Sequence, residues 1–278
     1  MSFWVLLAVL GAAFLHALWN ALIKLGTSKI GAMVILSVAE IPIGLVIAAS
    51  RPLPAAEVWP WVIAAGCTHF FYKTFLTFAY DRGDLSRVYP IARGAAPMIV
   101  ALVGAALLSD AITTMQYAGI GLLAAGIALM ARGVFTDGES RKLLPFALGS
   151  AVATAAYTLI DGLGARVSGD AVAYVAWVFV VDGLIFTLGM TALRGRSVYP
   201  SSPKAWAMGS FASLASYGAY AISIWAMTIA PIAVVAALRE TSILFAVLIG
   251  WLWFGERMTR DKALAAVMIV AGVITTRL

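Results

Sequence analysis

Ten apolar segments, separated by short polar breaks, restrict what this chain can fold into more than any other feature. A helix needs about 20 mostly apolar residues to cross a bilayer. The segments cover residues 3–25, 30–50, 58–80, 86–108, 113–132, 143–165, 171–193, 204–228, 231–253 and 260–277. The uncharged stretch from Ala205 to Leu238 is 34 residues long, which exceeds one span. Because proline ends a helix, Ile229-Ala230-Pro231 predicts a tight hairpin there.

Composition supports the same fold class. The chain is 63% hydrophobic and 12% charged, whereas soluble domains are about 45–50% apolar and about 25% charged. The sequence therefore predicts an all-α membrane protein with ten transmembrane helices. Cys67 is the only cysteine, which excludes an internal disulfide, and the two histidines lie far apart in the chain. We expect no metal site, no cofactor and no nucleic-acid partner.

Basic residues are distributed unevenly between the two ends of the predicted helices. With ten spans, thirteen lysines and arginines fall on one side and three, Arg51, Arg166 and Arg277, fall on the side of the termini. The positive-inside rule places both termini outside the cytoplasm and predicts a multi-pass protein of the inner membrane. We therefore interpret the basic residues behind the net charge of +6 as determinants of orientation in the membrane.

The two halves of the chain show a weak internal repeat. When residues 80–132 are placed on residues 226–278, Arg93 meets Arg239 and Asp110 meets Glu256. Membrane helices also look alike through composition alone, which is the alternative explanation. The repeat divides the chain into two halves, residues 1–137 and 138–278. Because each half has five spans, an odd number, the two halves must cross the membrane in opposite directions. This arrangement is the inverted repeat of secondary transporters, whose substrate site lies between the halves.

Several marks along the whole chain are similar to those of one family. They are Trp19, Pro90, Pro97, Asp110, Gln116, Gly119 and Gly126 in the first half, and Tyr157, Pro231, Phe254-Gly255-Glu256 and Gly272 in the second. In these marks the sequence resembles the drug/metabolite transporter superfamily, in its ten-helix EamA-like branch. It departs from the family pattern at Ile243, where a proline is expected, and at Ala265, which replaces a glycine.

The resemblance implies an alternating-access carrier that does not hydrolyse ATP, with export as the expected direction. Its relatives move amino acids, other metabolites or drugs, so the family does not define the substrate. The sequence shows no pairing of a nucleophile with a base, and we expect no enzyme activity. Because an internal duplication already provides a two-fold site, a monomer is expected.

Charged residues inside spans are the first candidates for substrate binding, since each costs about 2.5–3.5 kcal/mol on insertion scales and usually faces a wet interior. Arg93 shares a helix face with Tyr89 and Pro97. Its guanidinium can hold a carboxylate or phosphonate, or it can form a structural ion pair with Asp182 or Glu40. Arg239 is its counterpart in the ninth span and is followed by Glu240. These two residues can bind substrate or belong to a salt-bridge network.

Polar and aromatic residues at helical spacing complete the predicted site. His69, Tyr72 and Lys73 share a face of the third span, where Lys73 can bind an anion or extend to the interface. The other positions are His16, Trp19 and Asn20 in the first span, Tyr157 and Asp161 in the sixth, and Tyr217 and Tyr220 in the eighth. His16 is a candidate for carrying a coupling proton, and Asp161, near a helix end, can instead be solvated. We expect helices 1, 3, 4, 6, 8 and 9 to line the cavity.

Two classes of substrate fit these residues. Three intramembrane cations, Lys73, Arg93 and Arg239, favour an amino acid or a related zwitterion or organic anion. The alternative is a multidrug or quaternary-ammonium carrier, in which Trp19 and the tyrosines form an aromatic cage beside an acid.

Overall fold

A computed structural model describes residues 1–25, 28–80, 92, 96–108, 110–131, 141–255 and 258–277. Within these ranges the fold is entirely helical. The longer helices are α1 (Phe3–Leu25), α2 (Lys29–Ala48), α3 (Trp59–Tyr80), α5 (Ala96–Leu107), α6 (Thr114–Ala131), α8 (Leu144–Ser168), α9 (Ala171–Arg194), α10 (Pro203–Ile229), α11 (Ile232–Arg239), α12 (Ser242–Phe254) and α13 (Arg260–Thr275). Short 3₁₀ turns, η1 (Ala56–Val58), η2 (Arg141–Leu143) and η3 (Arg196–Val198), precede α3, α8 and α10.

The predicted all-α membrane fold is confirmed. Among the described residues, five segments are both long and apolar enough to cross a membrane: Phe3–Ile23, Lys29–Ala48, Leu144–Ser168, Ala171–Arg194 and Ile232–Trp253. The predicted hairpin is also present, because α10 ends at Ile229 and α11 begins at Ile232. At the α8–α9 turn, Gly169 adopts a left-handed φ of 67° and the Asp170 carboxylate accepts the N–H groups of Val172 and Ala173. This cap lets a very short turn reverse the chain.

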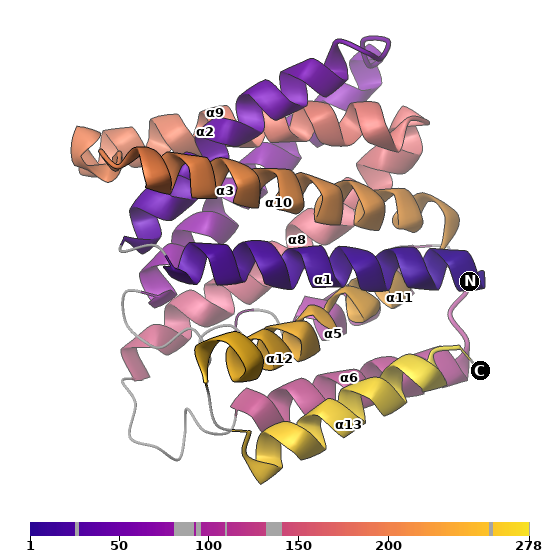
Figure 1. The fold of residues 1–278 in the computed structure, drawn as a ribbon. Coiled ribbons are helices and arrows are strands. Elements are labelled where there is room, and N and C mark those ends of the chain that lie inside the picture. The colour runs from indigo at the N-terminus through magenta and orange to yellow at the C-terminus, as the bar shows by residue number, and fades with distance from the viewer. Residues whose placement is uncertain are drawn as a thin grey trace.

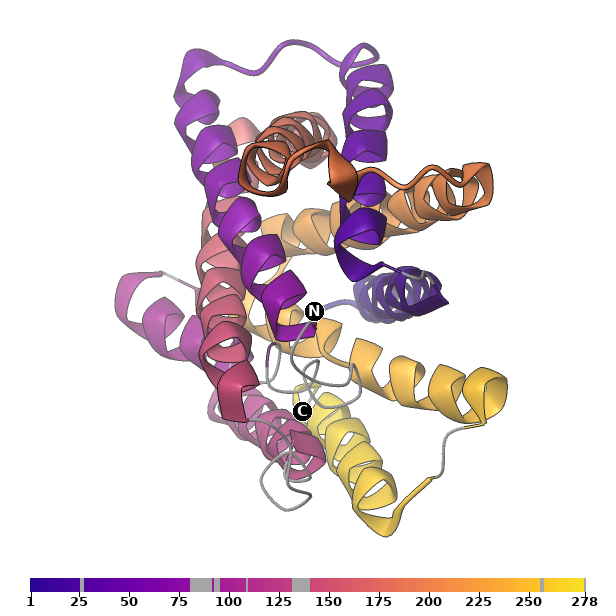
Figure 2. The same ribbon diagram turned by 90° about the vertical axis from the view of Figure 1, so that its left-hand side faces the viewer.

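The helices form one bundle in which both termini lie at the same end (Figure 1). The most extensive contacts join α2 to α9, α3 to α8, α1 to α10 and α6 to α13. Figure 2 shows α6 and α13 at one side of the bundle, away from α2 and α9. The core therefore sits where helices from both halves of the chain meet.

Glycines allow the closest of these approaches. A Cβ atom built on Gly119 of α6 would lie 2.8 Å from the Gly272 carbonyl oxygen, and one built on Gly272 would lie 2.8 Å from that of Gly119. Real side chains do not approach a backbone oxygen so closely, so α6 and α13 can pack at this distance only because both residues lack a side chain. Small residues are the usual means of packing helices in a membrane.

The ninth span differs from the prediction, which treated residues 231–253 as one continuous helix. It is interrupted at Glu240-Thr241, between α11 and α12. The N–H groups of Glu240, Thr241 and Ile243 bond to carbonyls three residues earlier, and the Thr241 hydroxyl donates to the Leu238 carbonyl at 2.7 Å. A 3₁₀ turn thus tightens the backbone beside two charged residues. Interrupted helices are common at the binding sites of transporters.

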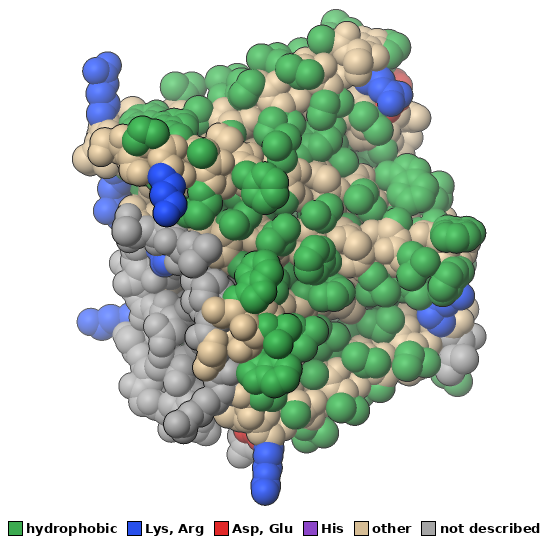
Figure 3. All heavy atoms as spheres, in the orientation of Figure 1, with side chains coloured by type: hydrophobic (Ala, Val, Ile, Leu, Met, Phe, Trp, Pro, Cys, Tyr) green, Lys and Arg blue, Asp and Glu red, His purple; other side chains and the backbone are tan. Residues whose placement is uncertain are grey.

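The surface agrees with a bilayer environment. Hydrophobic side chains cover the central area of the face drawn in Figure 3, and lysine and arginine side chains gather near its edges. Exposed apolar residues include Leu102, Leu188 and Leu252, each about two-thirds exposed. In a soluble protein such a surface would be an aggregation hazard, whereas lipid tails would solvate it here.

Candidate functional site

A small cavity, lined by charged, aromatic and aliphatic side chains, lies inside the bundle between the two halves of the chain. Its volume is about 40 Å³. The lining residues are His16, Trp19, Met33, Leu36, Glu40, His69, Tyr72, Lys73, Tyr157, Phe179, Asp182, Ser216, Tyr220 and Arg239. Sites for small molecules usually measure roughly 300–1,000 Å³. The cavity must therefore widen before a metabolite can enter.

Charged side chains from four helices form a continuous network along one wall of this cavity. Lys73 Nζ of α3 lies 2.7 Å from Glu40 Oε2 of α2 and 2.6 Å from Asp182 Oδ2 of α9. His69, one turn before Lys73, places Nδ1 3.4 Å from Asp182 Oδ2 and Nε2 3.2 Å from Asp161 Oδ2 of α8. All five side chains are at most 7% exposed. Every carboxylate thus contacts a basic side chain, and such neighbours reduce the free-energy cost of burying the acids.

Hydroxyl groups support both ends of the network. At the Lys73 end, the ammonium also donates to Ser37 Oγ at 2.9 Å. At the Asp161 end, the Tyr174 hydroxyl donates to Oδ1 at 3.0 Å and the Tyr220 hydroxyl donates to Oδ2. Asp161 is completely buried, so the alternative that it is solvated at a helix end is wrong.

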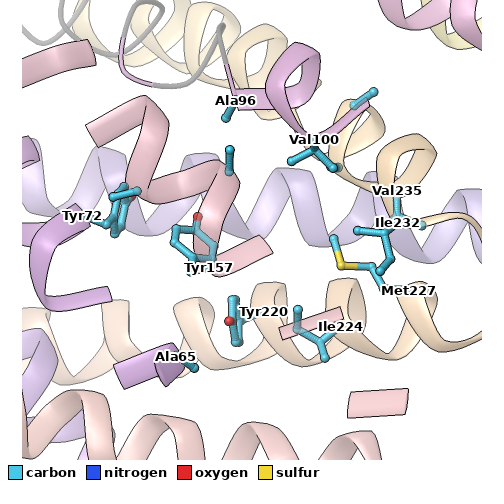
Figure 4. Close-up of a cluster of buried hydrophobic side chains, with 14 of the residues drawn as sticks. Ala65, Tyr72, Ala96, Val100, Tyr157, Tyr220, Ile224, Met227, Ile232 and Val235 are labelled. Atoms are coloured by element: carbon cyan, nitrogen blue, oxygen red, sulfur yellow. The ribbon is translucent and has the colours of Figure 1, made fainter. Parts of the chain in front are cut away.

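Aromatic rings form much of the remaining wall. Figure 4 shows Tyr72 of α3, Tyr157 of α8 and Tyr220 of α10 in the buried cluster. The Tyr157 ring lies 5.3 Å from that of Tyr72 and 4.3 Å from that of His69, centroid to centroid. On α1, the Trp19 indole N–H donates to His16 Nδ1 at 3.2 Å. The rings give the cavity an amphipathic wall, with polar edges and negatively charged faces.

Arg239 is the cation that the network does not neutralise. It lies at the C-terminal end of α11, immediately before the interruption, and is 6% exposed. Its guanidinium carbon lies 5.9 Å from the centre of the Tyr220 ring, a cation–π contact. Within the part of the chain that the structure describes, no carboxylate lies within ion-pair distance of it. A buried, always-charged group that faces a cavity is well suited to bind an anion.

The structure brings most of the predicted residues together. The cavity wall contains eight of them: His16, Trp19, His69, Tyr72, Lys73, Tyr157, Tyr220 and Arg239. Asn20 instead donates to the His16 carbonyl within α1 at 2.8 Å. Tyr217 packs its ring 5.1 Å from that of Phe179, and Asp161 lies behind the wall. Glu240 faces a narrow crevice with Pro97 and Thr158. Tyr89 and Arg93 lie outside the described residues.

The prediction of the lining helices needs correction. The second and seventh helices, α2 and α9, provide Glu40 and Asp182 as well as apolar wall residues. From the sequence, Arg93 was a possible partner of these acids, but Lys73, which contacts both, was not identified. Glu40 and Lys73 are 33 residues apart in the chain, and His69 and Asp182 are 113 residues apart. Such contacts depend on which helices become neighbours, and helix periodicity does not predict that.

A second ion pair joins the halves away from the cavity. Asp110, between α5 and α6, accepts two bonds from the Arg166 guanidinium, at 2.7 and 3.1 Å, and the Ile232 N–H at 2.9 Å. Arg166 also donates to the carbonyls of Met227 and Ala230. Burial opposes ionisation, but the bonds from Arg166 and Ile232 outweigh it and lower the pKa of Asp110. This pair, hereafter the Asp110 latch, ties α8 and the α10–α11 hairpin to the first half.

A helical bundle with two linked halves and a buried charged cavity defines a membrane carrier as the class of protein. Residues 141–278 match the model of the EamA-like transporter family. The chain therefore contains an EamA-like transporter domain of the drug/metabolite transporter superfamily, and the resemblance read from the sequence is confirmed.

The fold agrees with that assignment. A solved structure titled "Crystal structure of protein" superposes with a TM-score of 0.77 at 17% sequence identity, covering 98% of this chain and 96% of the other. At this identity the likeness concerns the fold alone. A comparison with curated proteins finds no match. The family and the apolar helices together make the protein a multi-pass membrane transporter.

Proposed function

We propose that the protein is a secondary transporter that exports an amino acid or a related zwitterion or organic anion across the inner membrane, and that it has no enzymatic role. The observation that carries this proposal is the buried Arg239, which faces the cavity without an acid partner among the described residues. A carboxylate or phosphonate can complete its coordination, and the acids of the opposite wall can receive an ammonium group. A zwitterion satisfies both sides at once.

The proposed residues divide into groups. Arg239 holds the anionic group, and Trp19, Tyr72, Tyr157 and Tyr220 shape the cavity around the carbon skeleton. Lys73 and His69 keep the acids in place. The remaining residues have an indirect role, in positioning these side chains. They are His16, Asn20, Asp161, Tyr217 and Glu240. We include Tyr89 and Arg93 from the sequence alone, as residues of the same site.

Alternating access requires the cavity to open on each side in turn. The Asp110 latch closes one end of the interface between the halves, so we propose that it separates in one state of the cycle. Binding energy from both halves would favour a closed conformation in which this cavity is wide enough to enclose the substrate. We further propose that the two halves are the inverted repeats predicted from the sequence, and that one chain suffices for transport.

The first test is thermal stabilisation of the purified protein. A ligand that binds only the folded state raises the apparent melting temperature by mass action. We expect L-alanine, L-glutamate or methylphosphonate to raise the melting temperature of the wild type but not that of Arg239→Gln. Arg260→Gln, which removes an exposed arginine at the start of α13, is the matched control and should respond as the wild type does.

A second candidate function has its own observation in the site. Aromatic rings and acids line the same cavity, as in sites for quaternary ammonium compounds. If tetraethylammonium or choline stabilises the protein, if this effect is lost in Glu40→Gln, and if Arg239→Gln leaves it unchanged, the multidrug function replaces the one proposed first.

A further inference from the structure

The charged network has one more acid than it has cations. In order, its members are Glu40, Lys73, Asp182, His69 and Asp161. Even with His69 protonated, three carboxylates face two cations within the described residues. A net charge buried in a membrane protein is unfavourable, and the usual remedy is to bind a proton or a counter-ion. No arrangement of ligands for a metal ion is present among the described residues.

Other groups around His69 do not supply the missing positive charge by contact. Tyr220 of α10 places its hydroxyl 3.1 Å from His69 Nε2, and the Tyr157 ring packs on the imidazole. Tyr174 of α9 bonds to Asp161. Arg239 of α11 and His16 of α1 line the same cavity, but no ion pair joins the Arg239 guanidinium to the acids that the structure describes. No cation in direct contact with the network therefore balances its third carboxylate among the described residues.

One oxygen of the network has no donor. Asp182 Oδ2 receives both Lys73 and His69, whereas Asp182 Oδ1 is buried without a hydrogen-bond partner. A buried carboxylate oxygen left in this way costs free energy unless a proton or a donor occupies it. Asp182 lines the cavity, so such a donor can be supplied by a bound molecule.

We propose that this five-residue network is the binding site of a coupling proton, and that the proton and the ammonium group of the substrate occupy it alternately. The inference rests on the proposed function. Without substrate, the network holds a proton on a carboxylate oxygen. When a zwitterion binds, its ammonium donates to the acids on the cavity wall, the proton leaves, and its carboxylate pairs with Arg239.

Exclusive binding of two ligands to one site makes the carrier an antiporter. A proton enters on the empty carrier and the substrate leaves on the deprotonated one, so each cycle exchanges a proton for a zwitterion. One positive charge enters the cell per cycle. Both the pH gradient and the membrane potential of an energised membrane would then drive export.

The first experiment measures the proton without any substrate. Infrared difference spectra of the purified protein, between alkaline and acidic pH, report protonation of buried carboxylates. Asp161→Asn leaves two acids facing two cations and keeps the shape that accepts the Tyr174 and Tyr220 hydroxyls. We expect the buried carboxyl signal of the wild type to be lost in this variant and retained in Asp170→Asn, an acid outside the network. Glu40→Gln shortens the network at its other end and should give the same loss.

The second experiment uses liposomes, with L-alanine and L-glutamate as probes. We expect an imposed pH gradient to drive net movement of a probe by the wild type. In Asp161→Asn, the ratio of gradient-driven movement to exchange of labelled for unlabelled probe should fall at least tenfold. A wild type that exchanges a probe without responding to pH overturns the coupling proposal and leaves the proposed function standing.

The two experiments separate the two ideas. An infrared signal that is the same in the wild type, Asp161→Asn and Glu40→Gln overturns the proton site, whatever the transport assays show. A signal lost in both variants, together with no exchange of either probe, supports the proton site and contradicts the proposed substrate class.

Discussion

At the scale of single residues, the site is dominated by charges that the bilayer makes expensive. Lys73 connects Glu40 and Asp182 through bonds of 2.7 and 2.6 Å, and its side chain is 6% exposed. Removing one member of a buried ion network is far more harmful than removing a balanced pair, because it leaves an uncompensated charge in a medium of low polarity. The central members of the network should therefore be the most sensitive positions.

We expect Lys73→Met to destabilise the protein by about 3 kcal/mol, since it leaves two carboxylates without their shared cation. The thermal unfolding of purified variants measures the effect. The double variant Lys73→Met with Asp182→Asn should recover part of the loss, because it removes one charge of each sign. If the double variant is less stable than Lys73→Met by the full effect of Asp182→Asn alone, the two side chains are not coupled as described.

At the scale of helices, packing depends on a few positions without side chains. Gly119 and Gly272 face each other across the contact between α6 and α13, where the opposite glycine's carbonyl and a neighbouring residue, Thr276 or Leu123, fill the space a side chain would need. The two glycines allow close packing only when both helices are present, so this contact cannot be recognised from either helix alone.

We expect Gly272→Val to destabilise the protein by about 2 kcal/mol through overpacking. Gly121→Val is the matched control, since a Cβ at Gly121 meets nothing within 4 Å and the residue lies on the same helix as Gly119. Thermal unfolding in one detergent compares the two. Equal effects of both substitutions would show that helix propensity, and not the α6–α13 contact, governs these positions.

The boundaries of the helices were predictable from the sequence, whereas the connections between them were not. Apolar runs of about 20 residues gave the first and seventh spans within one residue of α1 and α9. The interruption at Glu240-Thr241 was missed because the apolar pattern continues on both sides of it. Arg239 and Lys73 were recognised as charges inside spans, but the partners of Lys73 lie on α2 and α9, and only the packed structure defines those neighbours.

At the scale of the whole molecule, the four most extensive helix contacts keep their pattern when each helix is exchanged with its counterpart in the other half. The contact of α1 with α10 corresponds to that of α8 with α3, and α2–α9 and α6–α13 correspond to themselves. An inverted duplication is expected to produce these correspondences, and the repeat itself stays a prediction. Because helices of the two halves pack against each other throughout the bundle, a movement of one half against the other must break or rearrange contacts between them.

The Asp110 latch is such a contact, and its strength should depend on pH. Because its pKa is lowered in the folded protein, Asp110 stabilises the closed conformation above the ordinary pKa of aspartate, about 3.9. This contribution is lost as the pH falls through the lower folded-state value. We expect the melting temperature of Asp110→Asn to be lower than that of the wild type at neutral pH, and the difference to shrink on acidification.

The control for this prediction is Asp170→Asn, which removes a charge from the more exposed Arg51–Asp170 pair, where solvent screens the attraction. A difference between Asp110→Asn and the wild type that stays constant down to acidic pH would contradict the assignment.

The two ends of the chain meet. The Arg277 guanidinium donates to the Met1 carbonyl at 2.7 Å, and both termini lie at one end of the bundle (Figure 1). A short peptide would therefore be enough to join them without moving α1 or α13. In a circular permutant that begins at α8, the ribosome would make the second half first, and the same pairs of helices would still have to meet.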